Sequence, residues 1–102
     1  MHALIESHRS ELAKLCDRYY VQRLELFGSA ATGEFDPQSS DLDFLVEFQA
    51  TKAMNPADQY FGLWDELKRL FQRDVDLVTV GSLRNPYFID TVNKTKTKLY
   101  AA

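Results

Sequence analysis

The chain has 102 residues, of which 45% are hydrophobic and 13% aromatic, and its formal net charge is −3. This length suits one domain over residues 1–102, and the apolar content excludes a disordered chain. The acidic balance argues against a nucleic-acid partner. Because no apolar stretch approaches the ~20 residues that cross a bilayer, we expect a cytoplasmic protein without membrane contact. We expect its single cysteine, Cys16, to be buried and reduced.

The first half of the chain predicts one helix and two strands. Apolar residues recur at helical spacing over residues 3–19, and alternation predicts a strand over residues 21–27. Residues 30–40 are rich in small, Gly, Pro and Ser residues and predict a loop with at most one helical turn. A second strand is predicted over residues 42–48, with its apolar residues on one face.

The second half predicts a helix, a strand and a further helix. Asn55-Pro56 is typical of a helix start, and we expect the aromatic residues that follow it to lie in the core, namely Tyr60, Phe61, Trp64 and Phe71. Residues 75–80 predict a strand, residues 85–92 a helix and residues 98–100 a short strand. The order predicts an α/β fold of the α+β type, a small mixed sheet with helices packed against it.

Carboxylates mark the strands of this sheet. Side chains alternate along a strand, so Asp41 and Asp43 point the same way. Two like charges this close need a counter-charge, and a Mg²⁺ ion held by carboxylates and substrate phosphates supplies one. Asp76 lies inside an apolar run, where a charge is costly unless paired or metal-bound, and is the third candidate ligand; Asp74 is expected to be solvated. Three such carboxylates can bind two ions for in-line phosphoryl displacement.

Glycine and serine residues lie where a phosphate would be bound. Gly28 ends the first strand, where a glycine permits a sharp turn and close approach of a ligand. The hydroxyl of Ser29 can donate to a phosphate oxygen, and backbone N–H groups of a following helical turn suit the same anion. Gly33 gives the loop freedom, and Ser40 precedes the carboxylates. The ordered set predicts a site for a metal-bound nucleoside triphosphate.

At these residues the chain resembles the minimal nucleotidyltransferase (MNT) family of the polymerase-β-like superfamily. The resemblance runs through LFGSAATGEFDPQSSDLDFLVEF and DVDLVTV, and more loosely through SLRNPYFID and the terminal LY. It implies that Gly28 and Ser29 bind the nucleotide and that Asp41, Asp43 and Asp76 are the catalytic, metal-binding carboxylates. Family members often carry arginine where this chain has Thr32, and the loop from Ser29 is one residue longer than their commonest spacing.

The resemblance also implies a reaction and a partner. Such domains bind ATP and Mg²⁺, and many are antitoxins of HEPN ribonuclease toxins, to which they transfer AMP on a tyrosine hydroxyl. We therefore expect an adenylyltransferase with a HEPN partner, in a homo- or hetero-oligomer. The alternatives are an interaction module that neutralises the toxin by complex formation alone, and transfer to a small molecule or RNA. Tyr87 and Phe88 cannot both face inward on a short helix, so one of them is expected on a partner surface.

Overall fold

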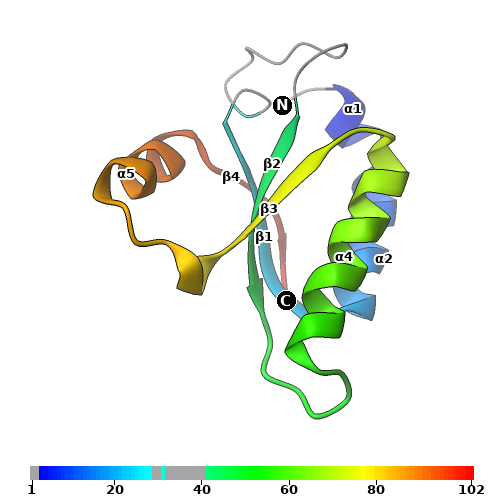
Figure 1. Ribbon diagram of the computed structural model, residues 1–102. Helices are drawn as coiled ribbons and strands as arrows, with labels where there is room; N and C mark the ends of the chain where they lie inside the picture. The colour runs from blue at the N-terminus through cyan, green and yellow to red at the C-terminus, as the bar shows by residue number, and fades with distance from the viewer. Residues whose placement is uncertain (1–2, 29–30, 32–40) are drawn as a thin grey trace.

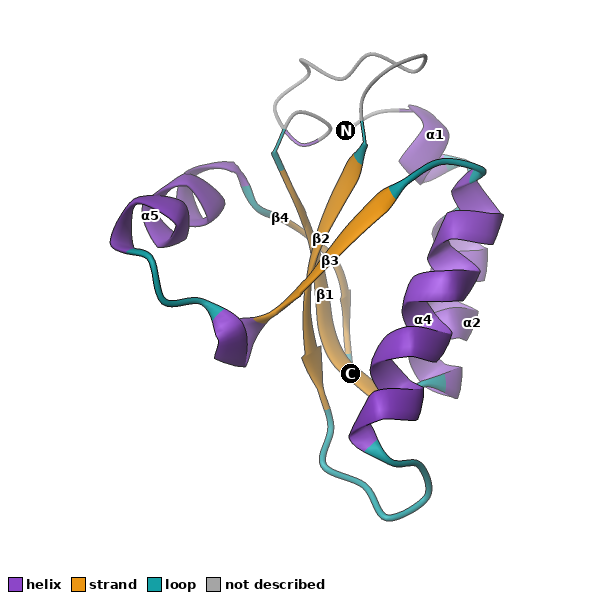
Figure 2. Ribbon diagram, in the orientation of Figure 1, coloured by secondary structure: helices purple, strands orange, loops and turns teal. Residues whose placement is uncertain are grey.

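The computed structural model describes residues 3–28, 31 and 41–102. The elements follow the predicted order, with small differences at their ends. In chain order they are α1 (Ala3–Glu6), α2 (Arg9–Arg18), β1 (Val21–Phe27), β2 (Leu42–Phe48), α4 (Pro56–Phe71), β3 (Val75–Thr79), the 3-10 turn η1 (Val80–Ser82), α5 (Pro86–Thr95) and β4 (Thr97–Ala101). Figures 1 and 2 show these elements.

Within the described ranges, four strands form one mixed sheet in the order β3-β2-β1-β4. β1 pairs antiparallel with both β2 and β4, and β2 pairs parallel with β3. The crossover between β2 and β3 is made by α4, as expected for parallel strands, which need a long connection. The predicted α/β class with a small mixed sheet is therefore confirmed.

The two faces of the sheet are covered differently. α2 and α4 lie on one side of the sheet and α5 lies on the other (Figure 1). Alternation along the strands assigns the side chains, because Leu24, Leu26, Phe44 and Val46 all belong to the cluster beneath α2 and α4. A second cluster lies between α5 and the sheet and consists of Phe27 and Leu45 with Val92 of α5 itself. The main core is thus on the α2–α4 face, and the α5 face has a much smaller one.

The larger core explains why α4 forms as it does. Asn55 accepts a hydrogen bond from the backbone N–H of Asp58 at 2.8 Å, and Pro56 occupies the first helical position. The helix ends at Phe71, and the next residue, Gln72, caps it in a left-handed conformation with φ 51°. Buried side chains recur along its inner face at helical spacing, namely Gln59, Leu63, Leu67 and Phe71. This is the amphipathic pattern on which the helix was predicted.

Two aromatic residues of α4 also protect the sheet edge. The Tyr60 hydroxyl donates to the Leu77 carbonyl at 2.5 Å, and the Trp64 indole N–H donates to the Val75 carbonyl at 2.7 Å. β3 is an edge strand, so these carbonyls have no neighbouring strand to accept from. Both residues are partly buried against the core, with their polar ends on the backbone.

The predicted single helix over residues 3–19 is wrong in one detail, since two helices occupy that range. Ser7 and His8 separate them: the Ser7 hydroxyl donates to the Leu4 carbonyl at 3.0 Å, and His8 Nδ1 lies 2.8 Å from the same oxygen. Side chains that bond to nearby backbone groups compete with the helical pattern. The prediction for Cys16 is confirmed, because the thiol is buried and free, and burial raises its pKa to about 12.

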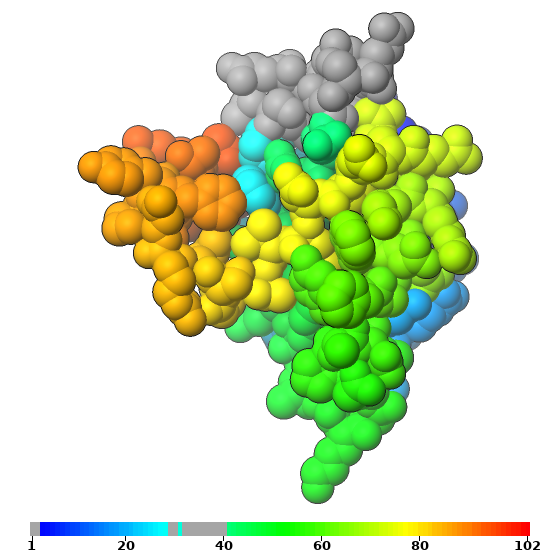
Figure 3. Space-filling model, in the orientation of Figure 1, coloured from blue at the N-terminus to red at the C-terminus, as the bar shows by residue number. Residues whose placement is uncertain are grey.

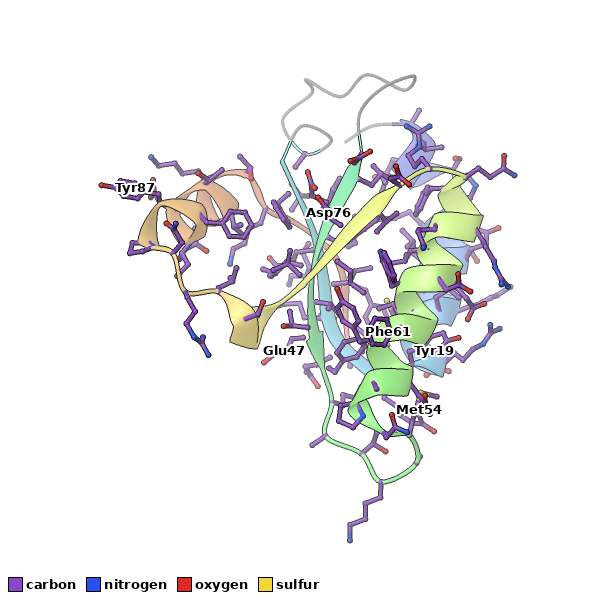
Figure 4. All side chains as sticks on the ribbon, viewed as in Figure 1. Tyr19, Glu47, Met54, Phe61, Asp76 and Tyr87 are labelled. Atoms are coloured by element: carbon purple, nitrogen blue, oxygen red, sulfur yellow. The ribbon has the colours of Figure 1, made fainter. Side chains whose placement is uncertain are left out.

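The aromatic residues of α4 and α5 correct and complete the predicted core. Phe71 is buried as expected, but Phe61 is 58% exposed and stacks edge-on against its neighbours, so its placement in the core was wrong. Tyr87 is 86% exposed and projects from α5 away from the sheet (Figure 4), whereas Phe88 packs edge-on against Phe27. Among the described residues, no helix is both long and apolar enough to span a membrane.

Candidate active site

Asp43 and Asp76 form the centre of the candidate site. They are directly opposite each other in the parallel register of β2 and β3, so their side chains leave the same face side by side. That face is the one beneath α5, and in Figure 4 Asp76 lies near the starting ends of both strands. The two carboxyl groups lie near enough that Asp76 contributes to raising the pKa of Asp43.

The electrostatics of this pair favour a proton or a cation. The pKa of Asp43 is raised to about 6, first by burial and then by the nearby carboxylates of Asp76 and Asp41. Desolvation and like charges both disfavour a carboxylate. No ion pair among the described residues includes Asp43 or Asp76. The pair is therefore a concentration of negative charge whose balance must come from outside the described protein groups.

The other two strand-start carboxylates have different positions. Asp41 immediately precedes β2, is exposed, and raises the pKa of Asp43. Asp74 is exposed at the foot of β3, where its carbonyl accepts from the Leu42 N–H at 3.3 Å, and takes no part in the carboxylate pair. Within the described part of the chain, no three His, Cys, Asp or Glu side chains are grouped closely enough to hold a metal ion by themselves. The Asp43 and Asp76 carboxylates lie side by side, and Asp41 is near enough to raise the pKa of Asp43.

One premise behind Asp76 was wrong. The apolar run around it suggested that its charge would be buried, yet Asp76 is exposed. The neighbouring Val75 and Leu77 are buried in the main core because they point to the opposite face. Strand alternation therefore turns Asp76 onto the thinly covered face, where its proximity to Asp43, rather than its burial, distinguishes it.

Gly28 lies against this carboxylate pair. It follows β1 with a left-handed φ of 74°, a conformation that favours glycine. A Cβ atom built on Gly28 would overlap the Asp43 Oδ2 atom. Its carbonyl accepts from the Ala31 N–H at 3.1 Å. Because Gly28 has no side chain, the Asp43 carboxylate can lie directly against it. The β1–β2 register places Phe27 opposite Asp43 and so brings Gly28 next to it.

The pair and the glycine line one cavity of about 420 Å³. This volume is in the range of small-molecule sites. Its walls come from the sheet and from both flanking helices, which Figure 3 shows as α5 in orange and α4 in green on either side of β3 in yellow. The lining residues are Phe27, Gly28, Asp43, Tyr60, Trp64, Val75, Asp76, Leu77, Val78, Phe88 and Thr91.

Basic groups on the same sheet face are engaged elsewhere. Glu25 is buried, and its carboxylate lies 3.1 Å from Arg23 Nε and 3.9 Å from Lys96 Nζ. The approach of Arg23 is an ion pair without hydrogen-bond geometry. Arg23 also lies 3.5 Å from Glu47. These cations balance Glu25 and Glu47 and are not paired with the Asp43 and Asp76 carboxylates.

Sequence reasoning found the polar centre of the cavity and missed its walls. Ser29, Gly33 and Ser40, predicted to bind the nucleotide, lie outside the described residues, as does Thr32. Thr91 was not singled out, and Tyr60 and Trp64 were assigned to the core alone. The signal in the sequence was their spacing of four on a helix, which puts them on one face, where the tyrosine hydroxyl and the tryptophan N–H both need hydrogen-bond acceptors.

The fold and the site together define a class of protein. A mixed sheet with two adjacent carboxylates on one face, beside a glycine that admits close approach of a ligand, is suited to cation-assisted chemistry on a phosphorylated substrate. A model of the nucleotidyltransferase domain matches residues 9–99. The chain belongs to this nucleotidyltransferase family, so its reaction class is nucleotidyl transfer and its substrate is a nucleotide.

Individual relatives agree with this assignment. A candidate protein adenylyltransferase of Methanocaldococcus jannaschii is 38% identical over 73 residues, which cover 72% of this chain and 71% of the relative. The solved structure of a candidate minimal nucleotidyltransferase is similar with a TM-score of 0.74 and 29% identity, over 91% of this chain and 90% of that one. A chain in the structure of the tri-AMPylated HEPN toxin of Shewanella oneidensis with an MNT antitoxin is 21% identical, with a TM-score of 0.65 over 96% and 73% of the two chains, and shares the fold.

Proposed function

We propose that this chain transfers AMP from ATP to a tyrosine hydroxyl of a HEPN toxin, and that this modification makes it an antitoxin. The observation that carries the proposal is the Asp43–Asp76 pair beside Gly28 in the 420 Å³ cavity. The activity is supported by relatives named as candidate protein adenylyltransferases. The partner is supported by the similar fold in the HEPN–MNT complex.

The reaction balances as an in-line displacement. The acceptor oxygen forms a bond to the α-phosphorus of ATP, and the bond between that phosphorus and the oxygen bridging to the β-phosphate breaks. Pyrophosphate leaves, and the acceptor hydroxyl loses its proton. A carboxylate of the Asp43–Asp76 pair within hydrogen-bond reach of the acceptor hydroxyl would be suited to receive that proton.

The carboxylates fit a divalent cation. Mg²⁺ is usually held by one or two carboxylates together with substrate phosphates and water. Asp43 and Asp76 supply such a pair, and no cation among the described residues is paired with either of them. Asp41, near this pair, is the third proposed ligand, and the three would hold two ions once the nucleotide contributes its oxygens. The bound ions would supply charge neutralisation at the phosphates and a more acidic acceptor hydroxyl.

The phosphate end is proposed to lie at Gly28 and the residues that follow it. Gly28 gives the phosphates room by lacking a side chain next to Asp43. Ser29, Gly33 and Ser40 are proposed as its partners in nucleotide binding, through a hydroxyl or backbone N–H groups. Aromatic and apolar residues complete the wall, as in many small-molecule sites.

Mass spectrometry tests the proposal directly. The chain is incubated with its HEPN partner, ATP and Mg²⁺, and we expect AMP-sized increments on partner tyrosines. Asp43→Asn and Asp76→Asn should each abolish the increments, whereas Asp74→Asn, which removes an exposed carboxylate from the same strand region, should not. A parent chain that binds ATP and the toxin yet leaves the toxin unmodified would overturn the proposal.

A ribonuclease assay separates chemistry from complex formation. The toxin is treated with parent or Asp43→Asn protein, separated from it, and assayed for RNA cleavage. We expect the toxin to stay inactive only after treatment with the parent. Inactivation that requires the continued presence of either protein would instead assign neutralisation to binding alone.

A further inference from the structure

The contact between α5 and Gly28 points to a residue outside the predicted site. The backbone N–H of Gly28 donates to the Thr95 hydroxyl oxygen at 3.2 Å. Thr95 is the last residue of α5, 67 positions further along the chain. This bond joins the helix on the thinly covered face to the glycine against which Asp43 stands.

The sheet register explains why a side chain makes this bond. Leu26 is the last residue of β1 that pairs with β4, opposite Thr97. Continuing the antiparallel ladder by two residues in each direction would place Gly28 opposite residue 95. The chain is still helical there, so a strand carbonyl is not available. The Thr95 hydroxyl takes the place of the missing ladder acceptor.

The orientation of the hydroxyl is fixed from its other side. Thr95 Oγ1 donates to the Thr91 carbonyl, one helical turn earlier, at 3.0 Å. Because the hydroxyl proton is directed into the helix, a lone pair of the oxygen is left to face the Gly28 N–H. Thr91 itself lines the cavity. Two successive hydrogen bonds thus connect the α5 backbone, through the Thr95 hydroxyl, to the Gly28 amide beside the site.

The backbone N–H of Gly28 is already engaged and is not free to donate to a phosphate. Its N–H is engaged by Thr95 and its carbonyl by Ala31. Its contribution to a phosphate site is therefore the position of its backbone, which must be held in a left-handed conformation directly against Asp43. If Gly28 shifted, its backbone would move toward or away from the Asp43 carboxylate that the proposed reaction uses.

We infer that Thr95 is a positioning residue, whose hydroxyl holds Gly28 and thereby sets the place of Asp43 in the cavity. The inference rests on the proposed function for its effect on catalysis, and on the hydrogen bonds alone for its effect on Gly28. A positioning role predicts a loss in kcat rather than in nucleotide affinity, because misplaced reacting groups slow the chemical step without removing binding contacts.

The test compares Thr95→Val, which keeps the branched shape and loses the hydroxyl, with Thr95→Ser, which keeps the hydroxyl. In the nucleotide-free protein, we expect the Gly28 amide to exchange with solvent about tenfold faster in Thr95→Val and at the parent rate in Thr95→Ser. In AMP transfer below the melting temperature of every variant, we expect kcat to fall about tenfold in Thr95→Val, with KM for ATP within about twofold, and to recover in Thr95→Ser.

Thr51→Val is the matched control. Thr51 also accepts a backbone N–H, that of Ala53 at 3.0 Å, but lies between β2 and α4 at the other end of the sheet (Figure 1). It should leave kcat and the Gly28 amide unchanged. Unchanged Gly28 exchange, or an unchanged kcat, in Thr95→Val would overturn the inference. If the parent transfers no AMP, the proposed function fails, and the exchange measurement alone decides whether Thr95 holds Gly28.

Discussion

One face of the sheet carries most of the hydrophobic core, and the other carries the candidate active site. On the face beneath α2 and α4, fifteen buried residues of the described part of the chain form a continuous core. Between α5 and the sheet, three buried residues of the described chain form a small cluster, and the same face carries the Asp43–Asp76 pair, which lines the cavity. A central strand therefore serves stability on one side and chemistry on the other.

This difference has a physical reason. Two carboxylates side by side destabilise a protein unless they are neutralised. We therefore expect them on the face of the sheet that contributes less to the stability of the fold. The large core supplies the stability that the α5 face lacks. The comparison predicts that substitutions on the two faces will differ in kind, with loss of stability on one and loss of activity on the other.

Leucines on opposite faces should show the largest difference. Leu26→Ala removes a fully buried side chain from the main core and should lower the free energy of unfolding by about 3–4 kcal/mol. Leu45→Ala acts in the small cluster, which α5 can close around more easily, and should cost about 2 kcal/mol. Urea denaturation measures both. Equal losses would show that α5 is as firmly packed as α4.

Gly28→Ala should separate activity from stability most clearly. The new Cβ would overlap the Asp43 carboxylate and occupy a left-handed backbone position, so we expect kcat/KM for AMP transfer to fall about a hundredfold. The backbone strain should cost only about 1–2 kcal/mol of stability. A Cβ at Gly81 would meet no atom within 4 Å, so Gly81→Ala is the control and should retain parent activity.

The pH dependence of stability should reveal the cost of the carboxylate pair. The pKa of Asp43 is raised from 3.8 to about 6, so the folded state binds more protons than the unfolded state between these values. The Asp43 contribution to stability therefore falls as pH rises from about 4 to about 6, and stays low above that.

Asp43→Asn removes this penalty. In metal-free buffer we expect the variant to match the parent near pH 4 and to exceed it by about 1 kcal/mol at pH 7, a modest value because solvent screens a half-buried carboxylate. Thermal melts across this pH range measure the difference, with Asp74→Asn controlling for removal of one negative charge. A gain that is constant with pH would rule out titration of Asp43 as its source.

The smallest effect is expected on the outer side of α4. Phe61 is 58% exposed and contacts Tyr60 and Trp64 only edge-on, so Phe61→Ser should change the free energy of unfolding by about 0.5 kcal/mol. Leu63→Ala, two residues along and fully buried, should cost several times as much. If both variants lose similar stability, the core extends further around α4 than its exposure indicates.

Several features of this protein follow from the sequence by itself. Alternation along residues 42–48 and 75–79 places apolar side chains on one face, and thereby directs Asp43 and Asp76 to the other. Asn55-Pro56 and Asn85-Pro86 start helices because the asparagine side chain caps and proline is tolerated in the first turn. These features are local, since each depends on residues within a few positions of one another.

Other features were decided only in the tertiary structure. Nothing in the periodicity of β2 and β3 sets Asp43 opposite Asp76, because the register of two strands depends on the packing of the helix between them. The same holds for Tyr60 and Trp64 at the β3 edge, and for the Thr95 hydroxyl on Gly28. Each is a contact between residues far apart in sequence, chosen by how the sheet and helices fit together. The sequence therefore predicted that these carboxylates share a site, whereas the position of Asp43 directly opposite Asp76 and the contacts that support them came only from the tertiary structure.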